Sequence, residues 1–280
     1  MVSAAAGKNG RAGKVNINTS PARLLLGLYC VGLLCLTSCS APAPVAEPPA
    51  ISASATLPVA DLLKQADEAY AGRANLDRVR EGLKALKRIR AVEPGHYEAA
   101  WRAARLNYTL GDHTKDEKER KAAFLEGIEA GKVAARVGAD KPDGHFWLGA
   151  NYGGNAQVEG PLTGLSAAKE MRRLMETVLK IDEGYQGGSA FMVLGRLDTE
   201  LPEMLGGDRK RAIETLERGL KHGEYNSLLR LRLAVAYREV KRNEDARREA
   251  NFILKMKPHP DFMPEYQESV EGARDLLNRL

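Results

Sequence analysis

The sequence has few of the residues from which catalytic and metal sites are built. Only three of its 280 residues are cysteines and five are histidines, and no histidine stands at metal-ligand spacing from another histidine, a cysteine or an acid. No G-x-S-x-G motif and no dinucleotide fingerprint occurs. Gly127–Val133 has three residues between its glycines where a phosphate loop needs four, and it ends in valine instead of serine or threonine. We therefore expect no enzyme, no cofactor and no metal site.

Long hydrophobic runs are also scarce. The apolar run Leu24–Leu36 has 13 residues, whereas a membrane-spanning helix needs about 20. It follows Lys8, Arg11, Lys14 and Arg23, and no acidic residue precedes it. A basic segment before a short apolar core is typical of a secretory signal peptide.

The residues that end this run, Leu36-Thr37-Ser38-Cys39, resemble a bacterial lipobox. The resemblance implies a signal peptide over residues 1–38 and a mature chain that begins at a lipidated Cys39 and is anchored to the membrane. Ser40 occupies the position where an aspartate would indicate inner-membrane retention. We therefore expect a location in the bacterial cell envelope, on the periplasmic face of the outer membrane. A plain signal peptide or an uncleaved anchor is the alternative.

Removal of residues 1–38 would change both the cysteine content and the charge. Cys30 and Cys35 would leave with the signal, so that the lipidated Cys39 would be the one cysteine left and no disulfide could form within the chain. Four basic and no acidic residues would also leave, and the net charge would fall from +5 to +1. Nucleic acid is therefore not an expected partner. Residues 39–58 are rich in Pro, Ala and Ser, which predicts a tether between the lipid and the domain.

Residues 59–280 have the pattern of a helical domain. Apolar residues recur at intervals of three and four, as in Leu62, Leu63 and Ala66, and short breakers such as Pro94-Gly95 separate these segments. Leu229–Leu233 alternates with period two, as a strand would. The run continues directly into helical composition, so we predict a helix there as well.

Internal repetition indicates the architecture. Around Tyr237, small and apolar residues, a pair of alanines and a final proline follow the spacing of the tetratricopeptide (TPR) repeat. Equivalent positions recur along the chain at Tyr70, Tyr108, Tyr152, Asp198 and Tyr237. We predict an all-α fold, a TPR-like helical-hairpin repeat array (α-solenoid) of about five helix pairs plus a C-terminal capping helix. A non-repeating helical bundle is the alternative.

The stretch from residue 143 to residue 208 is unusually rich in glycine, aromatic and polar residues. Glycine is costly inside helices, so these interruptions indicate close backbone approach or an irregular lining. We expect a ligand-binding cleft made by the third to fifth repeats. Its candidate residues are His145, Trp147, Asn151, Tyr152, Arg196, Asn226 and Arg230. The alternative is that the aromatic residues pack between helices and the arginines are solvated.

The same stretch resembles the T-component family of TRAP transporters, which are TPR-type periplasmic lipoproteins. Phe146-Trp147 at the start of a repeat matches, as does the motif Leu201-Pro202-x-x-x-Gly206-Gly207-Asp208. The resemblance covers residues 143–258 well and residues 59–142 by repeat pattern alone. It implies a helical domain with a central cleft or pore, a periplasmic solute-binding protein or a small solute as partner, and oligomerisation.

Two functions follow from these observations. The first is a membrane-anchored periplasmic binding lipoprotein that serves as an accessory component of a TRAP-type solute uptake system. The alternative is a TPR scaffold for envelope protein assembly that holds peptides or proteins on its concave face. An enclosed apolar cavity lined by Trp147 and Tyr152 would favour the first, and an open groove carrying Asn and Arg side chains would favour the second.

The lipid anchor gives a first prediction. Replacing Cys39 with serine removes the thiol that would carry the lipid, so the Cys39→Ser chain should lose metabolic labelling by palmitate and leave the membrane fraction. Flotation of the wild-type and variant chains on a density gradient measures this. A variant that is exported and still floats with membranes would show that the lipobox interpretation is wrong.

Overall fold

The computed structural model describes residues 57–280, apart from the side chains at positions 161, 162, 261 and 264. The expected signal peptide (1–38), the lipidated Cys39 and most of the tether (39–58) lie outside the described residues. The described part is entirely helical. Its elements are α1 (Val59–Ala71), α2 (Leu76–Val92), α3 (Tyr97–His113), α4 (Glu117–Val137), α5 (Pro142–Glu159), α6 (Pro161–Ile181), α7 (Ser189–Glu200), η1 (Glu203–Leu205), α8 (Arg209–Leu220), α9 (Ser227–Glu239), α10 (Asn243–Lys255), η2 (Pro260–Phe262) and α11 (Met263–Asn278).

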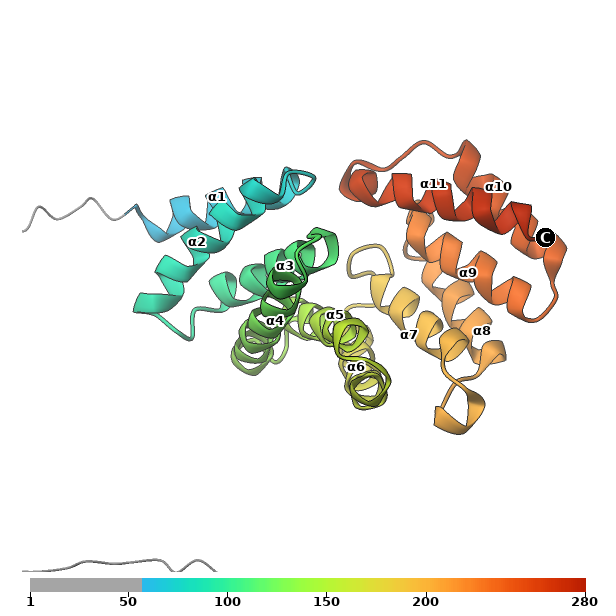
Figure 1. Cartoon of the computed structure of the whole chain (residues 1–280), viewed down its shortest axis with the longest axis horizontal. Coiled ribbons are helices and arrows are strands. Elements are labelled where there is room, and N and C mark those ends of the chain that lie inside the picture. Colours follow the sequence, from blue (N-terminus) through green and yellow to red (C-terminus); the bar gives the residue numbers. More distant parts are fainter. Residues whose placement is uncertain (1–56) are drawn as a thin grey trace, which may run out of the picture. The chain divides into compact units, whose positions relative to one another are not determined.

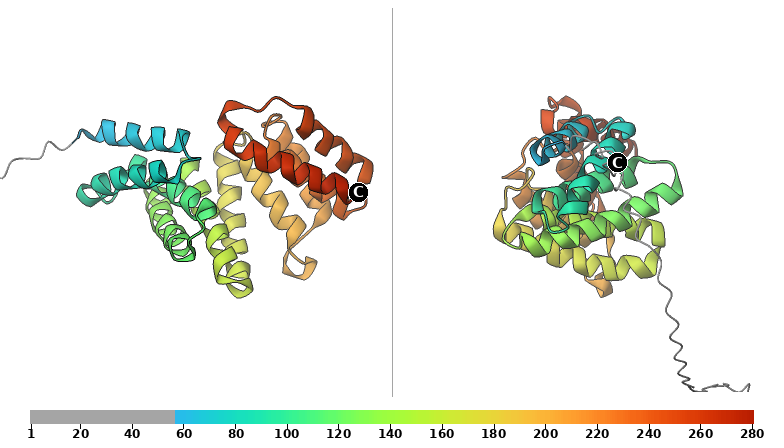
Figure 2. Two further views of the ribbon diagram at one scale, coloured as in Figure 1. Left: turned by 45° about the horizontal axis from the view of Figure 1, so that its top comes forward. Right: turned by 90° about the vertical axis from the view of Figure 1, so that its left-hand side faces the viewer.

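Consecutive helices pack as antiparallel pairs, and each pair packs against the next (Figure 1). The pairs are α1/α2, α3/α4, α5/α6, α7/α8 and α9/α10, and α11 covers the last pair. Figure 2 shows that the pairs stack side by side along a curved path. The predicted array of five helix pairs with a capping helix is thus confirmed, and Leu229–Leu233 lies in α9 as predicted.

Local sequence signals set the helix boundaries. The side chain of Asn75 accepts a hydrogen bond from the amide of Asp77 at the start of α2, and Asp116 accepts from two amides at the start of α4. Such caps satisfy backbone donors that have no partner within the helix. Pro142 begins α5, where its missing N–H costs nothing. The breakers seen in the sequence therefore coincide with the turns that reverse the chain.

Small residues allow the paired helices to approach closely. A Cβ atom on Gly144 of α5 would lie 2.5 Å from the backbone nitrogen of Ala135 in α4. One on Gly131 of α4 would lie 2.9 Å from Cα of Leu148 in α5. The backbones of α4 and α5 therefore touch at two points where no side chain fits, which fixes the crossing of the two helices.

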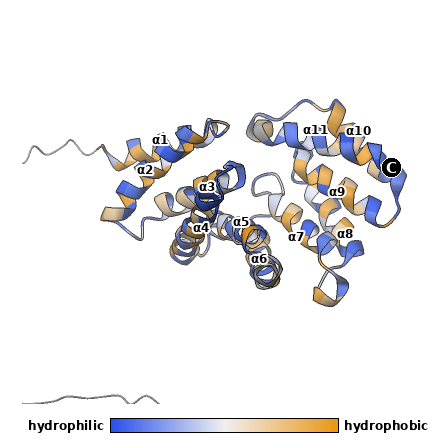
Figure 3. Cartoon of the chain, viewed as in Figure 1, coloured by the Kyte–Doolittle hydropathy of each residue, from blue (hydrophilic) through white to orange (hydrophobic). Residues whose placement is uncertain are grey.

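The repeat positions fall on one class of helix. Tyr70, Tyr108, Tyr152, Asp198 and Tyr237 lie on α1, α3, α5, α7 and α9, the first helix of each pair. Buried side chains from α1 to α7 form one continuous core, and those of α8 to α11 form two smaller clusters. Each pair thus buries apolar side chains against its neighbours. Figure 3 shows the mixture of apolar and polar residues along the helices. Within residues 57–280, no helix combines the length and apolar character needed to cross a bilayer.

Two glycines of neighbouring helices give opposite predictions for stability. Gly144→Ala forces a methyl group into the backbone of α4 and should lower the free energy of unfolding by about 1–3 kcal/mol. Gly164 of α6 has nothing within 4 Å of its would-be Cβ. Gly164→Ala should therefore raise the free energy of unfolding by about 0.5–1 kcal/mol through the entropy of the unfolded chain. Urea unfolding of the two variants tests this, and equal effects would contradict the close packing of α4 on α5.

Candidate functional site

The concave side of the array contains a partly open cavity of about 1730 Å³. The odd-numbered helices α1, α3, α5, α7, α9 and α11 line it, together with the start of α6 and the loops around residues 186, 222 and 260. Among the described residues, none of α2, α4, α8 or α10 contributes to the lining. The helices that carry the repeat positions therefore line the cavity together with α11. They are labelled α1, α3, α5, α7 and α9 in Figure 1.

An ion pair joins the two ends of the array across one side of this cavity. Arg73, in the turn between α1 and α2, donates from Nε and Nη2 to the carboxylate of Glu265 in α11 at 2.9–3.1 Å. The side chains are 9% and 26% exposed, so the pair is largely shielded from water. Arg73 also lies over the ring of Tyr70, 4.4 Å from its centroid. We refer to this contact between residues 192 positions apart as the seam.

One wall of the cavity is aromatic. Trp147 of α5 is 5% exposed and contacts the rings of Tyr70, Tyr108 and Phe146 at centroid distances of 6.3, 5.8 and 5.1 Å. Edge-on and tilted contacts of this kind stabilise aromatic clusters beyond their buried area. This cluster, from α1, α3 and α5, offers a rigid apolar surface to a ligand.

Beside the aromatic wall, an acidic residue is neutralised by two arginines. Asp67 accepts hydrogen bonds from Arg102 and from Arg105, the latter at 2.7 Å. Burial tends to raise the pKa of the Asp67 carboxyl, but the two guanidiniums outweigh it and lower the pKa. Arg105 also covers the ring of Tyr70 at 3.9 Å. These charges are satisfied within the protein and are not available to a ligand without loss of packing.

Arg232 of the cavity lining has carboxylates nearby but makes no direct ion pair within residues 57–280. Arg232 lies on α9, and its guanidinium makes no hydrogen bond within that part of the chain either. Burial and the nearby Arg196 lower the pKa of Arg232, while Glu200 and Glu268 act in the opposite direction. Arg196 itself donates from Nε to Glu200 at 2.8 Å. Burial also raises the pKa of Tyr108, which interacts electrostatically with Arg196, Arg232 and Glu268.

The lining as a whole is acidic. It carries four arginines and seven carboxylates, and no lysine of the described chain reaches it, so the cavity has an excess of three negative charges. The carboxylates are Asp67, Asp112, Glu200, Glu224, Glu265, Glu268 and Glu271. Three of the arginines pair with one of these acids, whereas Glu268 and Glu271 on α11 are exposed and make no ion pair within residues 57–280. Positively charged groups are therefore attracted to the face of α11.

Three of the predicted cleft residues do line this cavity. Trp147, Arg196 and Asn226 come together there from α5, α7 and the start of α9. Asn226 also has a structural role, because its side chain accepts from the amide of Leu229 and donates to the carbonyl of Gly187. It thereby caps α9 and fastens the glycine-rich loop before α7.

The other four predicted residues point elsewhere. His145 contacts the carbonyl oxygen of Ala139 at 3.0 Å, and Tyr152 packs against the core from outside the cavity. Asn151 is fully buried and donates to the carbonyls of Ala104 and Trp147. Arg230 is fixed by an ion pair with Glu249 at 2.7 Å and by the carbonyl of Glu224, and its guanidinium lies over the ring of Phe252. These contacts hold helices together.

The Leu201–Asp208 motif forms the loop between α7 and α8. Gly206 has φ of +91°, which favours glycine, and a Cβ on Gly207 would lie 1.8 Å from the carbonyl oxygen of Leu201. Pro202 precedes η1, and Asp208 caps α8 by accepting from the amide of Arg211 at 2.9 Å. The motif therefore encodes a tight reversal of the chain.

A buried carboxylate fastens this loop. Asp198 of α7 is 1% exposed and accepts from Arg172 of α6 at 2.5 Å and from Arg211 of α8 at 2.7–2.8 Å. Arg211 also donates to the carbonyl of Gly206. Asp198 occupies the position that is tyrosine in the other repeats. At this repeat, ion pairs therefore take the place of the packed tyrosine ring. Ion networks of this kind depend on every partner, since an unpaired buried charge is costly.

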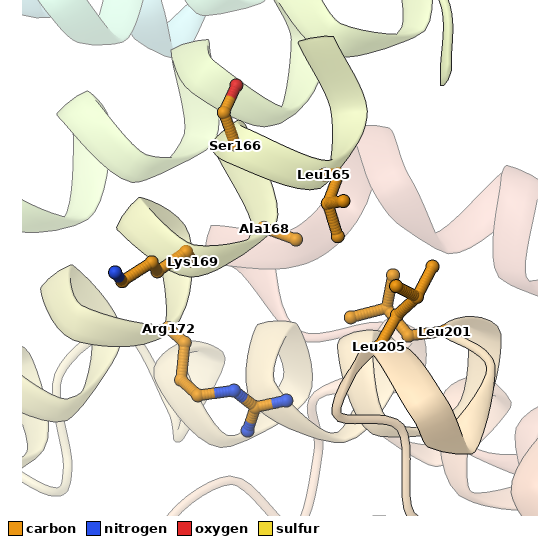
Figure 4. Close-up of a pocket in the computed structure, with 7 residues that line it drawn as sticks. All are labelled: Leu165, Ser166, Ala168, Lys169, Arg172, Leu201 and Leu205. Atoms are coloured by element: carbon orange, nitrogen blue, oxygen red, sulfur yellow. The ribbon is translucent and has the colours of Figure 1, made fainter. Parts of the chain in front are cut away.

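A smaller apolar groove lies between α6 and the α7–α8 loop, next to the cavity. It measures about 490 Å³ and is lined by Leu165, Ser166, Ala168, Lys169, Arg172, Leu201 and Leu205. Figure 4 shows the three leucines facing one another, with the two basic side chains to one side. Leu165, Ala168, Leu201 and Leu205 line both the groove and the cavity, so the α7–α8 loop borders one opening of the concave space.

Sequence reasoning misses the charged residues that distinguish the two walls. It selects Arg230 and omits Arg232, although the two lie about 200° apart around a helix and cannot both face the same side. Glu268 and Glu271 are unremarkable surface acids until α11 is placed over the cavity. The sequence does contain a signal for the orientation of α9. Leu229 and Leu233 are spaced by one helical turn and mark its core face, which fixes the side to which each arginine points.

Part of the chain matches a known sequence family. Residues 62–216 match the sequence family described as regulator of microtubule dynamics protein 1-3. Regulator of microtubule dynamics protein 3 of Rattus norvegicus is 22% identical over 234 residues, and its Xenopus laevis counterpart is 23% identical over 232 residues. These matches cover 78% and 77% of this chain. The chain spans about half the length of each relative, 49% in both cases.

Among solved structures, a thermophilic TPR protein of Thermus thermophilus is similar in fold. It shares 19% sequence identity and a TM-score of 0.56, over 76% of this chain and 99% of that protein. This likeness supports the TPR-like helical array. The matches described here do not support the expected resemblance to TRAP T-components beyond this TPR-like helical repeat.

The seam gives a prediction for stability. Arg73→Glu or Glu265→Arg places like charges in a shielded contact and should lower the free energy of unfolding by about 2 kcal/mol. Combining the two substitutions restores opposite charges and should recover most of this loss. Urea unfolding of the single and double variants measures the coupling.

A matched control comes from the exposed pair Lys210 and Glu214, whose side chains are 89% and 65% exposed. Charge reversal there should change the free energy of unfolding by less than about 0.5 kcal/mol. If the variant with both seam substitutions is no more stable than the variants with one, Arg73 and Glu265 do not pair directly.

Proposed function

Because the chain belongs to the family described as regulator of microtubule dynamics protein 1-3, we propose that it is a TPR-like scaffold that binds a peptide segment of another protein in its concave cavity. The observation that carries the proposal is the cavity of about 1730 Å³ lined by the odd-numbered helices. Repeat arrays use such a concave surface to bind extended or helical peptides.

The lining supports a peptide over a small apolar solute. The cavity is partly open and carries Asn226, Arg196 and Arg232, and Tyr152 is not part of its wall. An enclosed apolar chamber, which would favour a role in TRAP-type solute uptake, is not what these residues form. We therefore favour the scaffold over the transporter accessory.

The charge of the lining indicates the chemistry of the peptide. The aromatic wall around Trp147 offers contact for apolar side chains, and the exposed acids Glu268 and Glu271 attract basic ones. Electrostatic complementarity of this kind raises association rates and selects partners. The proposed partner is thus an apolar segment that also carries lysine or arginine.

The setting of this activity is also a proposal. A lipid on Cys39 would hold the domain at the membrane surface of the cell envelope, with residues 40–58 as the connecting segment. The names of the relatives refer to microtubule dynamics, and this chain matches about half of their length. The proposal therefore concerns the peptide-binding surface and includes neither an action on microtubules nor catalysis.

Photocross-linking tests the site. Benzoylphenylalanine replaces Met192, which lines the cavity, or Glu214, which is exposed on the outer helix α8. The probe is a degenerate pool of acetylated octapeptides built from Lys, Leu, Ala and Ser. Position 192 should capture peptides that contain both Leu and Lys, and position 214 should capture few. Equal capture at the two positions would refute concave binding.

Neutralising the acids of α11 tests the charge preference. The double variant Glu268→Gln, Glu271→Gln should bind the captured lysine-containing peptides with a Kd about threefold to tenfold higher. The effect is modest because each exposed charge pair contributes little. Glu244→Gln, a control at a position 94% exposed and outside the cavity, should have no effect. Enrichment of lysine-free peptides by the unmodified chain would contradict the proposal.

A further inference from the structure

The loop between α7 and α8 presents apolar side chains to solvent. Met204 and Leu205, both in η1, are 91% and 45% exposed, and Leu165 of α6 is 46% exposed. Figure 4 shows Leu165 and Leu205 on facing sides of the groove. Met204 adjoins Leu205 in the chain and lines neither the groove nor the cavity. We refer to these three residues as the apolar tip. Adjoining exposed apolar side chains with a polar rim mark surfaces that contact a partner or a membrane.

Backbone hydrogen bonds fix the loop that carries the tip. The amides of Leu205 and Gly207 donate to the carbonyl oxygen of Pro202 at 2.9 and 3.1 Å. The amide of Asp208 donates to the carbonyl oxygen of Asp198 at 2.9 Å. The buried carboxylate of Asp198 is in turn bonded to arginines of α6 and α8. The apolar side chains are therefore exposed on a closed, fastened turn.

Basic side chains surround the apolar tip. Lys169 lines the groove, and Arg209 and Lys210 begin α8 directly after the loop. Lys169 and Arg209 are exposed and make no ion pair within residues 57–280, and the side chain of Lys210 is 89% exposed. The groove lining, residues 201–211 and Asp198 together carry five basic and three acidic side chains, an excess of two positive charges. The surroundings of the tip are therefore basic, whereas the cavity next to it is acidic.

We propose that the apolar tip docks on a bilayer surface that contains anionic phospholipid. Met204, Leu205 and Leu165 enter the boundary between headgroups and acyl chains, and the neighbouring ammonium and guanidinium groups contact lipid phosphates. Burial of apolar area together with attraction to anionic headgroups holds proteins at this boundary. The inference does not rest on the proposed peptide binding, and it assigns a second interaction surface to the domain.

The distribution of charge over the domain favours this orientation. Figure 1 and Figure 2 show α11 and the α7–α8 loop at opposite sides of the described chain. The exposed acids Glu268 and Glu271 lie on α11, where an anionic surface repels them, whereas the positive excess surrounds the tip. An anionic bilayer therefore attracts the domain by the tip and turns α11 away.

Two other occupants fit the tip less well. A second copy of the chain that met it tip to tip would bring the same positive excess and be repelled. An acidic peptide seated in the groove would cover the leucines and leave Met204, which is outside the groove lining, in water. A fluid bilayer covers the groove and Met204 together.

Quenching by brominated phospholipid tests the contact. The full chain and its Met204→Trp variant are reconstituted into vesicles of phosphatidylcholine and phosphatidylglycerol, and floated vesicles with and without bromine on the acyl chains are compared. The unmodified chain supplies the signal of Trp101 and Trp147, which is subtracted. Bromine should quench about half of the fluorescence added at position 204, because this side chain lies at the acyl boundary. Leu125→Trp, a control on α4 where the leucine is 44% exposed, should be quenched by less than about a tenth, because α4 is not at that boundary.

The charge dependence is tested in the Met204→Trp background. Lys169→Gln combined with Lys210→Gln should lower the quenching about threefold, because each basic group near the surface adds to the attraction. Vesicles without phosphatidylglycerol should lower it to a similar extent. Lys64→Gln combined with Lys84→Gln is the control, on α1 and α2, where the side chains are 75% and 70% exposed, and it should leave the quenching unchanged.

Equal quenching at positions 204 and 125, or absence of the full chain from the floated vesicles, would overturn the proposal. Quenching at position 204 that depends on neither phosphatidylglycerol nor the two lysines would also contradict it. In detergent, the emission at position 204 is followed as the protein concentration rises and as octapeptides of Glu and Leu are added. A shift to shorter wavelength in either series would show that a second copy or an acidic peptide covers the tip, and the membrane assignment would be wrong.

Discussion

The architecture depends on how closely the helices of neighbouring segments approach. At Gly144 and Gly131, the backbones of α4 and α5 come so near that a single methyl group would have to displace main-chain atoms. Such contacts fix the angle at which one helix crosses the next, because packed interiors do not deform continuously. The repeated crossing turns a linear series of pairs into a curved array, and the concave space follows from that curvature.

Within this frame, charge is distributed unevenly between structure and cavity. Arg73, Arg105 and Arg230 each have a carboxylate partner, and they join segments that are distant in the sequence. Asp198 does the same for α6, α7 and α8. Arg232 has no such partner in the described chain, although it lies on the same helix as Arg230. Arg232 therefore differs from the other three arginines in making no ion pair that joins helices.

The sequence predicted the helices better than it predicted the site. Periodicity and breakers are local properties, so the five pairs, the capping helix and the helical state of Leu229–Leu233 could be inferred. The direction of each side chain depends on the rotation of its helix against its neighbours. For this reason Trp147 lines the cavity, whereas Asn151, one turn along α5, bonds to the backbone of α3. The residues of the Leu201–Asp208 motif make a chain reversal, which indicates a fold more directly than a transport role.

The seam has a consequence for how the chain reaches its final form. Most contacts in the array join neighbouring helices, so pairs can assemble progressively as each is synthesised. Glu265 meets Arg73 across 192 positions, so this contact can form only once α11 is in place. Until the ion pair forms, it cannot hold the first turn of the array against α11. A partner that reaches the concave face before the ends have joined would therefore meet a wider entrance than one that arrives afterwards.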